Sequence, residues 1–281
     1  MVIFYSRHSQ YDSIVPHNKT SMFYFNRQKK CLKEKLENFS PSHPDVKDIK
    51  ILVAGQIGGG KSSFINSVDS AFQGRISSRA LVYSYASGFT IRSGKKTLPF
   101  IFKDTMGLES PVWAGPQTED IINAVFGHVK DGYKFNEGQA ITDKDQHFNC
   151  DPNLSDQSFC LVYVIAADTV EYTDDCLLDK LKIIRQRISE KGIPQVIVMT
   201  KMDEVCPLVK KSLRKMFTSK KIKEKMELCS AKLGVPLTNI FPVKNYHNEI
   251  NTDDDIDVLL LKALEQIVQL ADDRLEDTDS Y

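Results

Sequence analysis

The stretch Lys50-Ile51-Leu52-Val53-Ala54-Gly55-Gln56-Ile57-Gly58-Gly59-Gly60-Lys61-Ser62-Ser63-Phe64-Ile65 decides how the rest of this 281-residue chain is interpreted. It begins with an apolar run, residues 51–54, that is typical of a buried strand. The run stops at a glycine, and residues 55–62 spell G-x-x-x-x-G-K-S, after which a helical pattern begins. A glycine-rich loop between a strand and a helix is the context in which this motif forms a P-loop.

A P-loop binds phosphate through its backbone. Glycines let the chain turn so that N–H groups point inward and surround phosphate oxygens, and the positive end of the following helix adds to the attraction. Lys61 is expected to reach the β- and γ-phosphates, and the Ser62 hydroxyl is expected to ligate Mg²⁺. The alternative is a strand–turn–helix without a ligand. The predicted phosphate-binding residues are Gly55, Gly58, Gly59, Gly60, Lys61, Ser62 and Ser63.

Composition indicates a globular protein and gives no case for nucleic acid. Hydrophobic residues make up 41% of the chain, charged residues 26%, and the formal net charge is zero. The charge is uneven, however. Residues 201–232 hold ten lysines and arginines against four acidic residues, and residues 249–281 hold two against eleven. A basic surface and an acidic tail are one interpretation, and self-association through opposite patches is the other.

The cysteines and the apolar runs predict a cytoplasmic protein. The six cysteines form no C-x-x-C pair and no metal-ligand spacing, as expected of free thiols in a reducing compartment. The N-terminal residues do not have the pattern of a secretory signal. The longest apolar run, residues 159–167, is too short to span a bilayer.

Alternating strands and helices predict an α/β fold of the P-loop NTPase type, with a mostly parallel sheet covered by helices on both faces. We expect a lead-in at residues 1–47 with one helix at 27–39, a G-domain-like unit at 48–271, and an acidic tail at 272–281. Within the unit, residues 89–93 and 97–102 resemble a β-hairpin. The long segment 110–158 is predicted to be a mobile insert with one helix at 119–129. Further strands are expected at 159–167, 195–200 and 239–243, and further helices at 62–72, 174–191 and 256–270. Residues 208–233 are expected to form one or two basic helices.

Two motifs after the P-loop indicate a guanine-nucleotide site. Residues 104–107 form a D-x-x-G at the end of a predicted strand, where Asp104 would organise Mg²⁺ and the Gly107 N–H would contact the γ-phosphate. Thr200-Lys201-Met202-Asp203 resembles the [N/T]-K-x-D box, in which the carboxylate accepts two hydrogen bonds that guanine offers and adenine does not. GTP is therefore favoured over ATP, which would require Asp203 to be incidental.

Three further positions bear on such a site. Asn245, beyond the last strand, could donate to the guanine oxygen or could be a turn residue. Leu108 follows the D-x-x-G, where Ras-like enzymes have a water-positioning glutamine, so hydrolysis is expected to be slow unless a partner or a second copy supplies a group. The switch residue that binds Mg²⁺ has five competing candidates, Ser77, Ser78, Ser84, Ser87 and Thr90.

The combination of motifs resembles the interferon-induced protein 44 family. The residues that carry the resemblance are 58–68, 72–74, 98–101, Gly107-Leu108, Asn245-Tyr246 and 271–273, and the match extends from about Arg27 to about Glu276. The resemblance implies a cytosolic, interferon-inducible protein linked to antiviral defence and to restraint of proliferation. It also implies binding of guanine nucleotide, and members usually carry an additional N-terminal region.

Two functions from different classes follow. The first is a switch that binds GTP or GDP with Mg²⁺ and hydrolyses GTP slowly or only with a partner. The second is an antiviral scaffold that acts through protein contacts and has a degenerate, non-catalytic nucleotide site.

Overall fold

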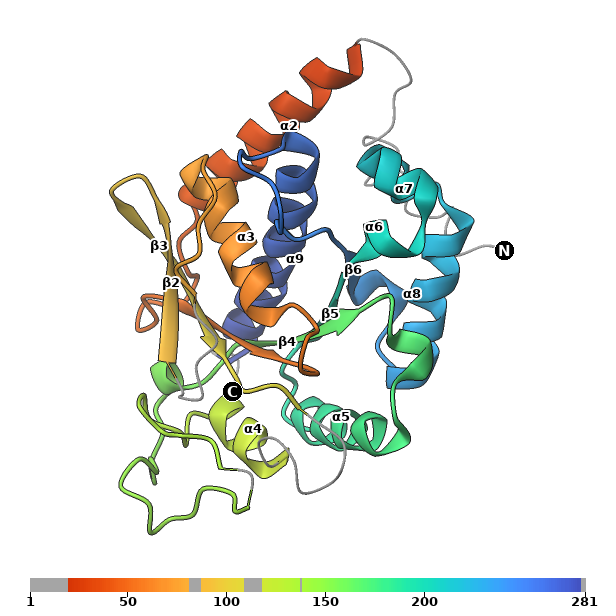
Figure 1. The fold of residues 1–281 in the computed structure, drawn as a ribbon. Helices are drawn as coiled ribbons and strands as arrows, with labels where there is room; N and C mark the ends of the chain where they lie inside the picture. Colours follow the sequence, from red (N-terminus) through yellow and green to blue (C-terminus); the bar gives the residue numbers. More distant parts are fainter. Residues whose placement is uncertain (1–19, 81–86, 109–117, 137, 279–281) are drawn as a thin grey trace.

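Six strands form one sheet in the order β2-β3-β1-β4-β5-β6 in this computed structural model, which describes residues 20–80, 87–108, 118–136 and 138–278 (Figure 1). The hairpin pair β2–β3 is antiparallel, and every other neighbouring pair is parallel. The predicted α/β class and the predicted hairpin are therefore confirmed. The strands are β1 (Ile49–Ala54), β2 (Ser87–Ser93), β3 (Lys96–Asp104), β4 (Cys160–Ala166), β5 (Gln195–Thr200) and β6 (Ile240–Pro242).

In the strand order, β1 is a central strand of the sheet. β1 lies between β3 and β4, so that Val53 is in register with Asp104 on one side and with Val162 on the other. β4 and β5 are buried along their whole length, as expected of parallel strands covered on both faces. The segments that follow β1, β3, β4 and β5 therefore meet at one edge of the sheet, where ligands bind in open α/β folds.

Helices cover both faces (Figure 1). α3 and α9 pack over the core that contains Ile51 and Val53, and α5 and α8 pack over the core that contains Leu52. Successive strand residues face opposite sides, so one apolar run supplies both cores. The helices are α2 (Thr20–Glu37), α3 (Lys61–Gln73), α4 (Thr118–Val125), α5 (Asp175–Ser189), α6 (Met202–Val205), α7 (Pro207–Lys211), α8 (Lys220–Leu233) and α9 (Asp254–Thr278).

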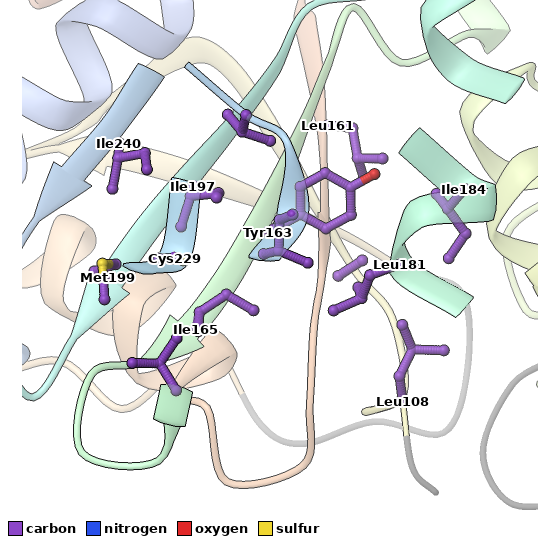
Figure 2. Packing of buried hydrophobic residues seen from close by; sticks show 14 of the residues in the cluster. Leu108, Leu161, Tyr163, Ile165, Leu181, Ile184, Ile197, Met199, Cys229 and Ile240 are labelled. Carbon is purple, nitrogen blue, oxygen red and sulfur yellow. The ribbon is translucent and has the colours of Figure 1, made fainter. Parts of the chain in front are cut away.

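The core on the α5 side is shown in Figure 2. Leu161, Tyr163 and Ile165 occupy alternate positions of β4, and their side chains lie on the face of the sheet against which Leu181 and Ile184 of α5 pack. The Tyr163 hydroxyl donates to Gln195 Oε1 at 2.8 Å, so the polar end of this buried ring has a partner.

Helix α2 belongs to the body of the domain. It confirms the predicted lead-in helix but begins earlier, at Thr20, and it packs on α9. Leu36 is buried in the α3–α9 core, and Lys35 pairs with Glu265 at 2.8 Å. The basic helix α2 thus lies on the acidic helix α9, so part of the acidic C-terminal segment is neutralised within the chain.

The last helix is longer than predicted. Its predicted end was Leu270, but α9 continues to Thr278, so residues 272–278 of the predicted acidic tail are helical. Ala271 and Leu275 are buried, which extends the apolar face of the helix beyond the predicted end.

The described part of the predicted insert packs against the core. Asp120 of α4 is buried and accepts hydrogen bonds from the backbone N–H of Ile141 at 2.6 Å and from the Tyr133 hydroxyl at 3.3 Å. Val129 and Phe148 form an isolated bridge. Sequence patterns did not predict this packing, because residues 130–158 contain no continuous helical or strand period. Among the described helices none has the length and apolarity that a bilayer span requires.

Candidate nucleotide-binding site

The loop after β1 has a backbone that only glycine fits at its first position. Gly55 has φ 140°, and a Cβ there would lie 2.3 Å from the Val164 carbonyl oxygen of the neighbouring strand. Gly60 has φ 95° and immediately precedes α3, and its carbonyl oxygen accepts the Phe64 N–H at 2.8 Å. The predicted P-loop therefore has the expected strand–loop–helix geometry.

Lys61 lies in this loop. Its ammonium group donates to the carbonyl oxygens of Gly55 at 3.1 Å and Gln56 at 3.2 Å. Burial lowers the pKa of Lys61, and the charge of Asp104 opposes this shift. The cation is thus held where loop and helix meet, which is the position that the motif predicts.

Ser62 and Asp104 are neighbours although they are 42 residues apart in the chain. The Ser62 hydroxyl donates to Asp104 Oδ2 at 2.7 Å, while Asp104 Oδ1 is buried without a hydrogen-bond partner. Burial raises the pKa of Asp104, and the contacts with Ser62 and Lys61 act against that rise. Mg²⁺ prefers hard oxygen ligands, so this pair, with one carboxylate oxygen unused, fits the predicted magnesium site.

The D-x-x-G segment is joined to the P-loop. The Leu108 N–H donates to the Gly55 carbonyl oxygen at 2.9 Å, and the Ile57 N–H donates to the Leu108 carbonyl oxygen at 3.3 Å. A Cβ on Gly107 would lie 2.8 Å from the backbone nitrogen of Ile57, so a side chain does not fit there. Gly107 therefore contacts the phosphate loop directly.

The Leu108 side chain is 1% exposed and lies in the α5-side core (Figure 2). The position at which Ras-like enzymes have a polar residue is thus turned into the core, away from the loop. This orientation agrees with the expectation that residue 108 supplies no water-positioning group.

The segment that follows β5 brings the Thr-Lys-Met-Asp box to the same edge. The buried Thr200 hydroxyl donates to the Gly59 carbonyl oxygen at 2.6 Å. Lys201 has φ 55°, a left-handed conformation that no other non-glycine residue adopts in the described part of the chain, and its ammonium group lies 3.3 Å from Asp168 Oδ2. Such strained residues cluster at functional sites. Sequence reasoning gave Thr200 no role of its own.

Asp203 lies on the short helix α6 and has a neighbour that sequence reasoning missed. Desolvation raises the pKa of Asp203, and the charge of Lys244 lowers it in part. The Lys244 ammonium lies 3.9 Å from Asp203 Oδ2 and 2.7 Å from Glu249 Oε1. Burial alone would lower the pKa of Lys244, but these two carboxylates raise it. The sequence signal that could have identified Lys244 as a site residue was its position directly after the predicted strand 239–243.

Asn245 contacts the P-loop. Its side-chain Nδ2 donates to the Gly60 carbonyl oxygen at 3.1 Å, and its Oδ1 is buried without a hydrogen-bond partner. The sequence left open whether this amide donates to the guanine oxygen or belongs to a turn residue. In the structure it donates to the carbonyl oxygen of Gly60, the glycine that precedes Lys61.

The structure gives different surroundings to the candidates for the Mg²⁺-binding switch residue. The Ser77 hydroxyl donates to buried Asp69 Oδ2 at 2.6 Å, so it is occupied on α3. Ser84 lies outside the described residues. Asn66 pairs with both backbone groups of Ala80 at 2.7 Å, which fixes the segment after α3 to that helix. Of the others, Ser78 is exposed, and Ser87 and Thr90 lie in β2.

Comparison with solved structures gives similarity to GTP-binding proteins. The chain is similar to Toc33 from Arabidopsis thaliana, with 17% identity, 88% of this chain and 91% of that chain covered, and a TM-score of 0.49. It is also similar to a probable GTP-binding protein engB, with 13% identity, coverage of 79% and 98%, and a TM-score of 0.44. No family model matches the chain.

Comparison with curated sequences gives closer relatives. Human interferon-induced protein 44 is 35% identical over 258 residues, which are 89% of this chain and 58% of that protein. Human interferon-induced protein 44-like is 33% identical over 251 residues, 86% and 56% respectively, and the mouse protein 44 is 31% identical over 255 residues, 88% and 60%. The chain thus spans less than two thirds of the length of these relatives. Over the region that it shares with them, the chain belongs to the interferon-induced protein 44 family.

Proposed function

We propose that this chain binds guanine nucleotide with Mg²⁺ and hydrolyses GTP slowly or only with a partner. The observation that carries the proposal is the hydrogen bond from Thr200 to Gly59, because it joins the predicted base-reading box to the predicted phosphate loop. This contact between residues 141 positions apart in sequence supports the proposal that the two motifs belong to one site.

The residues divide into a phosphate side and a base side. Backbone N–H groups of residues 55–63 and the Lys61 ammonium would bind the phosphates, and Ser62 and Asp104 would hold Mg²⁺. Bound Mg²⁺ neutralises charge on the phosphate oxygens. The Gly107 N–H would contact the γ-phosphate. Asp203 would accept the guanine N1 and N2 hydrogens, with the aliphatic part of Lys201 along the base.

Asp203 provides the sharpest test. Replacing it by asparagine turns one acceptor oxygen into a donor, which no longer matches the 2-amino group of guanine. Xanthine has an oxygen at that position and therefore matches the amide. We expect Asp203→Asn to lose affinity for GDP and to gain affinity for xanthosine diphosphate, measured by titration calorimetry with Mg²⁺. Glu204→Gln, an exposed neighbour on α6, is the matched control and should bind GDP as the parent does.

The phosphate side has its own test. Lys61→Ala should abolish measurable binding of both GDP and xanthosine diphosphate. A parent protein that binds neither GDP nor GTP, or binding that is unchanged in Lys61→Ala, contradicts the proposal. Equal displacement of labelled GTP by ATP would show that Asp203 does not select the base.

The second candidate is an antiviral scaffold in which nucleotide is a structural ligand or absent. The burial of Leu108 in the core favours it, since residue 108 then supplies no polar group for hydrolysis. Folded Lys61→Ala and Asp203→Asn proteins that keep antiviral activity in interferon-treated cells would support this function over the switch. For both candidate functions we propose a cytoplasmic location.

A further inference from the structure

A series of polar contacts connects helix α2 with the P-loop. The Lys29 ammonium of α2 lies 2.7 Å from Asp257 Oδ2 of α9, and Asp257 is completely buried. The Tyr246 hydroxyl donates to the other oxygen of the same carboxylate at 2.6 Å. One buried carboxylate thus receives a cation from α2 and a hydroxyl from the segment after β6.

Tyr246 is fixed at both ends. Its hydroxyl oxygen accepts the Asp253 N–H at 2.8 Å, in addition to its bond to Asp257. Its backbone N–H donates to the Ser67 hydroxyl at 2.9 Å, and that hydroxyl donates to the Ser63 carbonyl oxygen at 2.6 Å in the first turn of α3. The ring therefore spans the distance between α9 and the helix that begins at the P-loop.

Asn245 is the residue before Tyr246, and its amide donates to the Gly60 carbonyl oxygen. A shift of the Tyr246 ring would move this amide, because the two residues share a peptide unit. A Cβ on Gly60 would lie 3.0 Å from Asn245 Nδ2, so the two segments are in close contact. The position of Asn245 against the loop thus depends on how Tyr246 is held.

We propose that Lys29 is a positioning residue for the nucleotide site, acting through Asp257 and Tyr246 to hold Asn245 against the P-loop. The proposal rests on the proposed function for its ligand, but its structural part concerns the loop itself. Without Lys29, the Asp257 carboxylate is buried beside Tyr246 without its cation partner, which is costly. The carboxylate must then take a proton or move, and either change alters its bond to the Tyr246 hydroxyl.

Helix α2 contains a matched control. Lys35 also pairs with a carboxylate of α9, at 2.8 Å from Glu265, but no described contact links Glu265 to the segment after β6. When Lys35 is replaced, Glu265 still has the Lys262 ammonium at 2.7 Å, so this variant is expected to lose little stability. A second control variant, one that does lower the stability of the protein, is therefore needed. Leu36→Ala serves this purpose, since it removes a buried apolar side chain of α2.

The experiment measures the dissociation constant of fluorescently labelled GDP with Mg²⁺ at a temperature where circular dichroism shows each variant folded. Lys29→Met and Tyr246→Phe should weaken binding by roughly two- to thirtyfold, the range of coupling along such networks. Lys35→Met and Leu36→Ala should stay within about twofold of the parent. Lys29→Arg should restore most of the affinity. The double variant Lys29→Met/Tyr246→Phe should lose no more than Tyr246→Phe alone, because both changes break one series of contacts.

A measurement without nucleotide separates this proposal from the proposed function. Amide hydrogen exchange at residues 55–63 should be faster in Lys29→Met than in Lys35→Met and Leu36→Ala, whether or not the protein binds GDP. Equal exchange in all three variants, or equal loss of GDP affinity in all three, would overturn the role of Lys29. A parent protein that binds no guanine nucleotide, with the exchange difference still present, would overturn the proposed function alone.

Discussion

The Thr200 hydroxyl donates a 2.6 Å hydrogen bond to the carbonyl oxygen of Gly59, and both the hydroxyl and its strand are buried. This bond connects the carboxyl end of β5 with the loop after β1, across the intervening strand β4. A second connection of the same kind runs from Asn245 to Gly60. Two consecutive carbonyl groups of the phosphate loop are therefore held by one side chain at the end of β5 and one that follows β6.

Thr200→Val keeps the shape of the side chain and removes this bond. The Gly59 carbonyl then has no donor from β5, so we expect a loss of about 1–3 kcal/mol in the free energy of unfolding. We also expect weaker GDP binding, because the loop is less well fixed. Urea unfolding and labelled-GDP titration check both effects. Thr238→Val is the control: its hydroxyl is exposed, and the change should cost less than about 0.5 kcal/mol.

The raised pKa of Asp203 predicts a pH dependence with opposite signs for binding and for stability. Guanine needs the charged carboxylate, so GDP affinity should fall as pH decreases through the native pKa, which desolvation places above that of an ordinary aspartate. Without ligand, the native state keeps this proton over an interval in which the unfolded chain has released it. Rising pH through that interval therefore lowers the contribution of Asp203 to stability.

Titrations of GDP between pH 7 and pH 4.5 test the first sign, and urea unfolding over the same range tests the second. Asp203→Asn is the control, since its amide does not titrate. A parent protein whose affinity for GDP has the same pH profile as this variant would contradict the prediction.

Asp104 should control the effect of Mg²⁺. Its buried Oδ1 has no hydrogen-bond partner, and its Oδ2 accepts from Ser62. Asp104→Asn keeps an acceptor for the hydroxyl but removes the charge, so we expect metal affinity to fall by about 10–100-fold. GDP titrations with Mg²⁺ and with EDTA measure the difference. Asp131→Asn, whose side chain is 73% exposed, should leave the Mg²⁺ effect unchanged.

The sequence predicted those parts of the fold that repeat a local pattern. β5 has the predicted bounds, residues 195–200, because its apolar run is continuous and is followed by the Thr-Lys-Met-Asp box. α9 exceeded its predicted end because Ala271 and Leu275 are separated by three charged residues, which obscure the apolar period. The packing of residues 130–158 was not predictable from local patterns, since it depends on the buried carboxylate of Asp120 in the preceding helix α4.

In the candidate site, too, local features could be predicted from the sequence and some long-range contacts could not. Residues within one motif, such as Lys61 and Ser62, occupy the positions that the motif implies. The contacts of Lys244 and Asn245 with the other motifs were not predictable, because they depend on sheet order: Asn245 and Lys244 reach Gly60 and Asp203 only when β6 lies beside β5. The direction of the Leu108 side chain also required the structure, since it follows from the backbone pairing between residues 56 and 108.

Gly107→Ala tests the contact between the D-x-x-G segment and the P-loop. The new Cβ would lie 2.8 Å from backbone atoms of Ile57, which cannot move aside without disturbing the hydrogen bond from the Ile57 N–H to the Leu108 carbonyl oxygen. We expect a loss of about 1–3 kcal/mol in stability, as for other overpacked sites, together with weaker GTP binding. Gly138→Ala is the control, because only the Asn136 side chain lies near, at 3.6 Å. Equal stabilities of the two variants in urea would contradict this contact.

Leu108→Gln tests whether residue 108 is directed to the phosphate site or to the core. The structure places the side chain among buried residues such as Leu181, so a glutamine there would bury an amide without known partners and would leave the phosphates out of its reach. We therefore expect a loss of about 2–4 kcal/mol in the free energy of unfolding and no increase in single-turnover GTP hydrolysis. Leu108→Met nearly conserves volume and should cost less than about 1.5 kcal/mol. A glutamine variant that is stable and hydrolyses GTP faster than the methionine variant would show that residue 108 reaches the site, so the proposed slow hydrolysis would then be a property of the leucine and not of the fold.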